Sequence, residues 1–271
     1  MLDQISLIFS YQFMQRALIV GLLVSLCAAV LGVSLVLKRY SMIGDGLSHV
    51  GFGSLAVAMV LGLAPLAVTI PVVVLAAFLL LQLNEHNKLK GDSVIAVIST
   101  AALAIGVMVL SLSGGMTSDV NSYLFGSVLA MSASDAVLSI WLAGAVLVLF
   151  VLFYRPIFAI TFDETFARAT GQKTRLFNIL LAALTAVTIV LGMRIMGAML
   201  ISSLVIFPAL SAMCLCKSYK GVTISAAIVS VCGYFSGLCL SYWLSTPTGA
   251  TVVVIHLAVY LVCLVIRKVR C

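Results

Sequence analysis

Long apolar runs separated by short polar breaks dominate this chain. Nine of these runs approach the roughly 20 residues that a helix needs to cross a bilayer. They cover residues 17–37, 44–63, 66–83, 93–112, 135–154, 176–192, 196–216, 222–244 and 250–266. The pattern predicts an all-α, polytopic membrane protein with about nine transmembrane helices, in a range of eight to ten. We expect a single transmembrane domain over residues 1–271.

One of the breaks, residues 116–134, is too polar to span and contains Asp119, Asn121 and Gly126. Backbone that enters a membrane without crossing it must be covered by protein or face a cavity. We therefore expect a short re-entrant or interfacial helix in this stretch.

Composition separates this chain from the soluble classes. Of its 271 residues, 63% are hydrophobic and 8% are charged, and the mean hydropathy is +1.28. A soluble domain carries about 25% charged residues. These values exclude a water-soluble enzyme and a disordered chain. The net charge of +7 would suggest a nucleic-acid partner, but none is expected because the basic residues follow the membrane pattern.

The basic residues are distributed unevenly between the predicted spans. If the C-terminus is cytoplasmic, the inner segments hold 13 of the 15 Lys and Arg residues, and the outer segments hold only Arg16 and Arg194. Cytoplasmic loops of membrane proteins are enriched in Lys and Arg, so the chain is predicted to be N-out and C-in. No cleavable signal peptide is expected, because the first residues carry Asp3 rather than a basic segment.

Ionisable side chains are rare inside the spans, and two of them share one helix face. Asp45 and His49 are four residues apart, which places both on the same side of a helix. A charge at the bilayer centre costs about 2.5–3.5 kcal/mol, so such residues usually have a function. The pair is compatible with a structural role, in which Asp45 caps the helix, and with a divalent-cation site.

The metal interpretation needs more ligands than one chain supplies. Asp45 and His49 offer one carboxylate and one imidazole, whereas zinc takes about four ligands. A two-fold dimer would place two copies of each residue around one ion. Small neighbours favour close packing of membrane helices; they are Gly44, Gly46, Ser48, Gly51 and Gly53.

The remaining candidate ligands are expected to be packing residues. His256 is alone in the last predicted span. Cys214 and Cys216 form a single C-x-C pair, which is weak evidence for a metal site. Free cysteines in apolar runs behave as small hydrophobes.

The polar loop over residues 161–175 is expected to contain a short helix over 163–171. Asp163 is a candidate N-cap, Glu164 and Arg168 are spaced to pair, and Gly171 is a candidate helix stop. Phe162 and Phe166 make one apolar edge on a segment that is expected to face the cytosol. This edge fits either an interfacial helix lying on lipid or a docking helix for a cytosolic partner.

No nucleotide-binding signature is present in the chain. The segment 171–174 lacks the leading glycine and the spacing of a P-loop, and H-E-x-x-H is absent. The chain is therefore expected to have no enzymatic activity and to bind no cofactor. ATP-driven transport would need an ATPase on a separate polypeptide.

Several segments resemble, in order, the permease subunit of bacterial ABC importers for zinc and manganese. The most specific is the basic pair Lys38 and Arg39 followed by Gly-Asp-Gly-Leu-Ser-His at 44–49. The others are 118–119, 123–127, 162–171, 184–188, 197–201, 207–209, and 241–242 with 246–249. The resemblance covers the chain from about residue 16 to its end.

This resemblance implies a homodimeric permease in the bacterial plasma membrane, with two cytosolic ABC ATPase subunits and an extracytoplasmic metal-binding protein. It implies that Asp45 and His49 line the path of the metal. It also implies that Asp163, Glu164, Phe166, Arg168 and Gly171 belong to a coupling helix that seats in the ATPase.

Two other classes of function are weighed against this one. A proton- or sodium-coupled secondary transporter would use Asp45 and His49 as a proton relay. An intramembrane enzyme is the weakest, because no nucleophile and base are arranged together. The resemblance implies that the cargo is a divalent metal ion, and imidazole ligands favour zinc over manganese only weakly.

Overall fold

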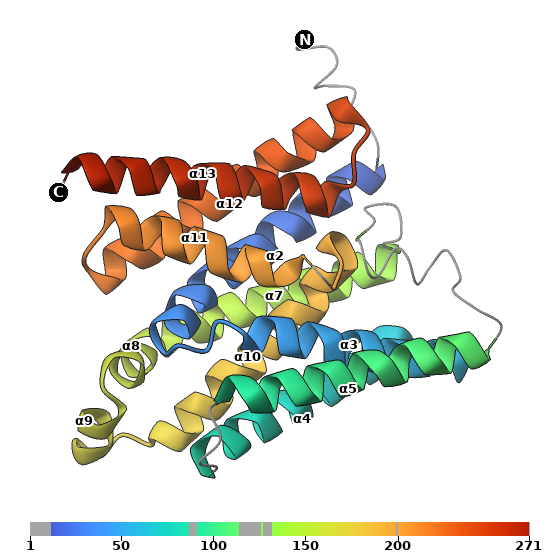
Figure 1. Cartoon of the computed structure of the whole chain (residues 1–271), viewed down its shortest axis with the longest axis horizontal. Coiled ribbons are helices and arrows are strands. Elements are labelled where there is room, and N and C mark those ends of the chain that lie inside the picture. The colour runs from blue at the N-terminus through green and yellow to red at the C-terminus, as the bar shows by residue number, and fades with distance from the viewer. Residues whose placement is uncertain (1–11, 87–90, 114–125, 127–131, 199, 271) are drawn as a thin grey trace.

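The computed structural model describes residues 12–86, 91–113, 126, 132–198 and 200–270, and every regular element in these ranges is a helix (Figure 1). The helices are α2 (Gln12–Leu37), α3 (Ile43–Val60), α4 (Pro65–His86), α5 (Gly91–Leu112), α7 (Ala133–Leu152), α8 (Tyr154–Phe162), α9 (Glu164–Ala169), α10 (Thr174–Met196), α11 (Ile201–Leu215), α12 (Tyr219–Leu244) and α13 (Thr248–Arg270). Within the described ranges, eight helices are long and apolar enough to cross a membrane. This confirms the all-α, multi-pass class. Most of the stretch 116–134, expected to be re-entrant, lies outside the described residues.

The seventh predicted span is shorter in the structure than in the prediction. α10 continues through Gly192 to Met196 and is followed by Gly197 with a φ of 87°. α11 then has 15 residues, about 22 Å of helix. The two helices meet at 197–200 and not at 193–195, because a glycine with a left-handed φ, and not a polar break, separates them.

A second difference lies after α7, where the sequence predicted a polar loop. Tyr154–Phe162 forms the nine-residue helix α8 instead. Pro156 lies in its first turn, where a missing N–H costs no intrahelical hydrogen bond. The rings of Phe158 and Tyr219 lie 5.0 Å apart, so α8 packs against the start of α12.

α2 is the central helix of the bundle and packs against α7, α10, α11 and α12. Polar contacts join α2 and α12 along their length. Tyr234 donates a hydrogen bond to the Ala17 carbonyl at 2.9 Å, and Ser230 donates to the Ser25 carbonyl at 2.8 Å. Gly21 allows this approach, because a Cβ there would collide with the ring of Tyr234.

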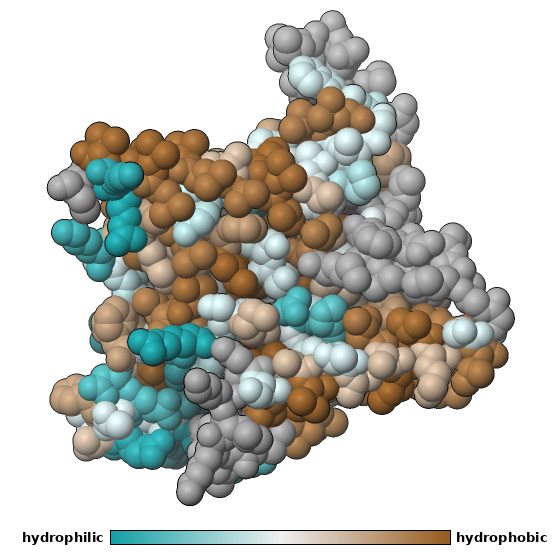
Figure 2. Space-filling model, in the orientation of Figure 1, coloured by the Kyte–Doolittle hydropathy of each residue, from teal (hydrophilic) through white to brown (hydrophobic). Residues whose placement is uncertain are grey.

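A second group of helices lies beside α2, in which α3 packs against α4 and α5, and α10 packs against α4. The end of α2, helices α8 and α9, and the C-terminal end of α13 lie at the same end of the bundle (Figure 1). Figure 2 shows hydrophilic residues gathered at that end, while most of the coloured surface elsewhere on this face is hydrophobic. This distribution agrees with the charge asymmetry found in the sequence, and the side of the membrane that this end faces stays a prediction.

Candidate functional site

Asp45 and His49 lie together on α3. Asp45 is in the first turn of the helix, and its Oδ2 is 3.5 Å from Nε2 of His49. In a tetrahedral site with ligand atoms at about 2.1 Å from the metal, neighbouring ligand atoms lie about 3.4 Å apart. The two side chains are therefore spaced as neighbouring ligands of one ion would be.

The pair opens onto a groove of about 510 Å³ between α3 and α5. Ile95, Ser99 and Leu103 of α5 form the opposite wall. The Asp45 side chain is 38% exposed and that of His49 is 16% exposed. Among the described residues, no third His, Cys, Asp or Glu joins them in a cluster that could hold a metal ion. A single chain thus presents one carboxylate and one imidazole on the wall of a groove that is open on one side.

The structural alternative, in which Asp45 caps α3, is only partly met. The N-cap residue is Met42, and no side chain caps the helix. Asp45 nevertheless lies in the first turn, where a negative charge is favourable to the helix dipole. Nδ1 of His49 is buried without a hydrogen-bond partner, so the imidazole is not fully satisfied by packing inside the chain.

The small residues beside the pair are used inside the subunit, contrary to the expectation that they would serve contact with a second copy. A Cβ on Gly46 would lie 2.6 Å from Ile95, and a Cβ on Gly106 would lie 2.9 Å from the Cα of Gly53. α3 and α5 therefore pack backbone to backbone. A stripe of small residues does not tell which neighbour it receives: Gly46 and Gly53 receive α5, whereas Gly51 receives Met193 of α10.

The predicted helix in the loop is present as α9, and its two ends follow the sequence. Asp163 is the N-cap, and its carboxylate accepts hydrogen bonds from the Phe166 N–H at 2.9 Å and from the Thr165 hydroxyl at 2.5 Å. These two hydrogen bonds hold the pKa of Asp163 below its usual value. Gly171 follows the helix with a φ of 84°.

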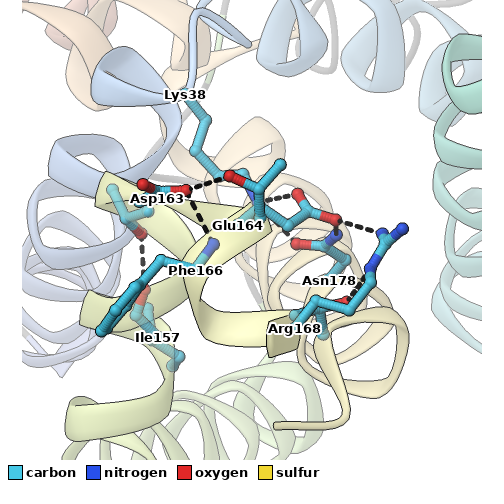
Figure 3. A network of polar contacts seen from close by, with 10 residues as sticks. Lys38, Ile157, Asp163, Glu164, Phe166, Arg168 and Asn178 are labelled. Carbon is cyan, nitrogen blue, oxygen red and sulfur yellow. Dashed lines mark hydrogen bonds and ion pairs between the residues drawn. The ribbon is translucent and has the colours of Figure 1, made fainter. Parts of the chain in front are cut away.

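The predicted Glu164–Arg168 pair also forms, at 3.3 Å. Phe166 is 67% exposed, and Figure 3 shows it on the other side of α9 from Arg168 and Asn178. α9 therefore carries an ion pair on one side and presents an aromatic ring to its surroundings on the other.

Two partners of Glu164 were not found by sequence reasoning. Lys38, at the end of α2, lies 3.3 Å from Glu164, and Asn178 of α10 donates to it at 3.0 Å (Figure 3). Lys38 is separated from Glu164 by 126 residues. The only signal in the sequence was the basic pair that ends the first span, and that signal does not identify its partner.

The remaining candidate ligands lie away from this groove. His256 is 1% exposed, and its Nδ1 is 2.9 Å from the Val252 carbonyl. Cys214 and Cys216 are free thiols, and the Cys216 sulfur lies 3.2 Å from the Ser225 hydroxyl. Nε2 of His256 is buried without a hydrogen-bond partner, so packing satisfies only one nitrogen of this imidazole, and the Cys216 contact agrees with the expected packing role.

The fold and the groove define a class of protein, namely a polytopic membrane protein with a polar pair between its helices and a short helix with an exposed aromatic ring at one end. The chain matches the ABC 3 transport family over residues 10–267 and belongs to that family. It is therefore a membrane component of an ABC transporter.

Named relatives support this assignment over nearly the whole chain. The manganese import system permease protein ScaB of Streptococcus gordonii is 27% identical, covering 93% of this chain and 90% of that protein. The chelated iron transport system membrane protein YfeD of Yersinia pestis is 27% identical, covering 97% and 88%. The solved structure of PsaBC from Streptococcus pneumoniae in complex with Fab is similar, with a TM-score of 0.87, 26% identity, and coverage of 97% and 95%.

Proposed function

We propose that this chain is the permease subunit of an ATP-driven importer of a divalent transition-metal ion, with Asp45 and His49 as ligands of the ion in transit. The observation that carries the proposal is the 3.5 Å separation of the two side chains on the wall of an open groove. Carboxylate and imidazole without thiolate bind such ions, and a cargo site must also release its ion.

A second copy of the chain would complete the site. The groove is open, and α5 continues from it as an exposed apolar face that includes Val97, Ile105 and Met108. A carboxylate facing lipid is costly, so a partner surface is favoured here. Two copies related by a two-fold axis would give two oxygen and two nitrogen ligands.

The other partners follow from the family and from α9. Two cytosolic ATPase subunits would each receive one α9, with Phe166 as an exposed apolar contact, and an extracytoplasmic binding protein would deliver the metal. The family match favours ATP-driven transport over a proton- or sodium-coupled carrier. The preference for zinc stays a prediction, since relatives are named for manganese and iron.

The test is uptake of radioactive zinc or manganese by vesicles that contain equal amounts of assembled complex. Asp45→Asn and His49→Ala should each reduce uptake by about tenfold or more, because even the loss of an outer-shell partner of a metal ligand costs about 10–100-fold in affinity. Ser54→Ala is the matched control, because Ser54 lies on the same helix and its hydroxyl donates to the Gly51 carbonyl one turn back and not to a residue of the groove. Near-normal uptake by either site variant would contradict the proposal.

A further inference from the structure

The end of α2 is tied directly to α9 and α10 through one buried cation. Nζ of Lys38 lies 2.6 Å from Oδ1 of Asn178 and 3.3 Å from Oε2 of Glu164 (Figure 3). The Lys38 side chain is only 7% exposed. Because water screens this cation so little, its interactions with Glu164 and Asn178 are stronger than those of a cation in a surface ion pair.

Asn178 contacts both other residues, so Lys38, Glu164 and Asn178 form a triangle of polar contacts. Asn178 accepts a hydrogen bond from Lys38, and its Nδ2 donates to Oε1 of Glu164 at 3.0 Å. Arg168 approaches the same Oε1 from the exposed side of α9. Each member of the triangle belongs to a different element, so a displacement of α9 must either move the end of α2 or break charged hydrogen bonds.

The connection from Lys38 to the metal ligands is short and rigid. α2 ends in a Schellman turn, in which Arg39 has a φ of 61° and Tyr40 donates from its N–H to the Leu35 carbonyl at 2.8 Å. The N–H of Ile43 then bonds to the Tyr40 carbonyl at 3.0 Å. Asp45 follows two residues later. No flexible linker lies between the buried cation and the first metal ligand.

We propose that Lys38, Glu164 and Asn178 act as positioning residues that transmit movement of α9 to the Asp45–His49 pair. This inference rests on the proposed function, because it requires an ATPase at α9 and a metal at α3. When the ATPase displaces α9, the triangle carries the displacement to the α2–α3 turn and shifts the ligand pair relative to α5.

A simpler role for the triangle would be to anchor α9 to the bundle. An anchor and a relay differ in what is lost when the triangle is broken. Loss of an anchor reduces docking, so ATP hydrolysis and metal uptake fall together. Loss of a relay leaves hydrolysis in place and reduces only the metal moved per ATP. The ratio of uptake to hydrolysis therefore separates the two roles.

The experiment uses the full permease with its ATPase in proteoliposomes, with zinc or manganese uptake and ATP hydrolysis measured on the same vesicles. Lys38→Met should keep hydrolysis within about twofold of the wild type and lower the uptake-to-hydrolysis ratio by about fivefold or more, the range of typical coupling effects. Lys268→Met is the control, since it removes an exposed cation from α13 at the same end of the bundle.

An exchange of charges provides a second variant that does not depend on how Lys38→Met folds. Arg168 lies 3.3 Å from the Glu164 carboxylate and would repel a cation at that position, so the exchange is made in an Arg168→Gln background. There Lys38→Glu and Glu164→Lys should each lower the ratio, and the two together should restore it to within about twofold of that background. The Asn178 amide can rotate by half a turn and serve the exchanged pair, because it has both a donor and an acceptor.

Three outcomes would overturn the inference. They are a wild-type ratio in Lys38→Met, a parallel loss of hydrolysis and uptake, and a double variant no better than the single ones. A wild-type complex that shows no ATP-dependent metal uptake would instead contradict the proposed function itself, and the inference would fail with it.

Discussion

Arg194, in the last turn of α10, forms an ion pair with Asp135, in the first turn of α7. The sequence placed Arg194 in an outer segment, yet it belongs to a helix and its side chain is largely buried. Ser132 adds to the arrangement, because its hydroxyl donates to the Asp135 carboxylate at 2.6 Å and accepts from the Asp135 N–H. The ion pair holds the end of α10 against the start of α7.

We expect Asp135→Asn to destabilise the permease, because it removes the negative charge that pairs with the largely buried Arg194 guanidinium. The loss should be about 1–3 kcal/mol, as for a partly buried group that loses a charged partner. Thermal or denaturant unfolding of the detergent-solubilised protein measures it. Arg16→Gln is the control, since the contact of Arg16 within the described residues is a weak one, 3.5 Å from Gln12. Equal stability of Asp135→Asn and the control would show that the ion pair does not contribute to the free energy of unfolding.

Gly171 should tolerate asparagine and reject valine. Its φ is 84°, a value that β-branched residues avoid, and a Cβ built there meets nothing within 4 Å. The penalty is therefore one of backbone conformation and not of space, about 1–2 kcal/mol for valine and less for asparagine. Hydrogen exchange of the α9 amides measures this difference. Equal protection in the two variants would mean that the turn can adopt another conformation.

The local features of the chain could be predicted from its sequence, and the distant contacts could not. The spans, the Asp163 cap and the turn at Gly171 depend on neighbouring residues, so hydropathy and helix-end chemistry are sufficient to predict them. The triangle around Lys38 depends on residues more than a hundred positions apart. Its partners are fixed by tertiary packing, which a single sequence does not reveal.

The candidate site shows the same difference between local features, which the sequence predicts, and tertiary contacts, which it does not. The spacing of Asp45 and His49 correctly placed both on one face of α3. The neighbouring glycines, however, receive other helices of the same subunit: Gly46 and Gly53 receive α5, and Gly51 receives α10. Small residues specify that a neighbour comes close, and only the packing of the whole bundle decides which neighbour it is.

The orientation of the chain in the membrane gives a further prediction. Single cysteines at Gly171 and near the end of α13 should react with an impermeant reagent only from the cytoplasmic side, and a cysteine at Pro247 only from the other side, because 13 of the 15 basic residues then face the cytoplasm. The measurement is labelling of intact against permeabilised cells, in a variant without the natural cysteines. Labelling of Gly171 from outside would remove α9 from the reach of any cytosolic ATPase.

The N-cap of α9 should stay intact over the whole neutral and mildly acidic range. Hydrogen bonds from Thr165 and Phe166 lower the pKa of Asp163, so its carboxylate stabilises the helix above the unfolded pKa, and this contribution is lost only as the pH falls through the still lower folded value. Hydrogen exchange of the α9 amides, corrected for the intrinsic pH dependence of exchange, should therefore give the same protection at pH 7.5 and pH 5. Asp163→Ala should reduce protection at both pH values, while Asp163→Asn, which keeps an acceptor oxygen, should retain most of it. Protection that falls between pH 7.5 and pH 5 in the wild type would show that a group other than Asp163 holds the start of the helix.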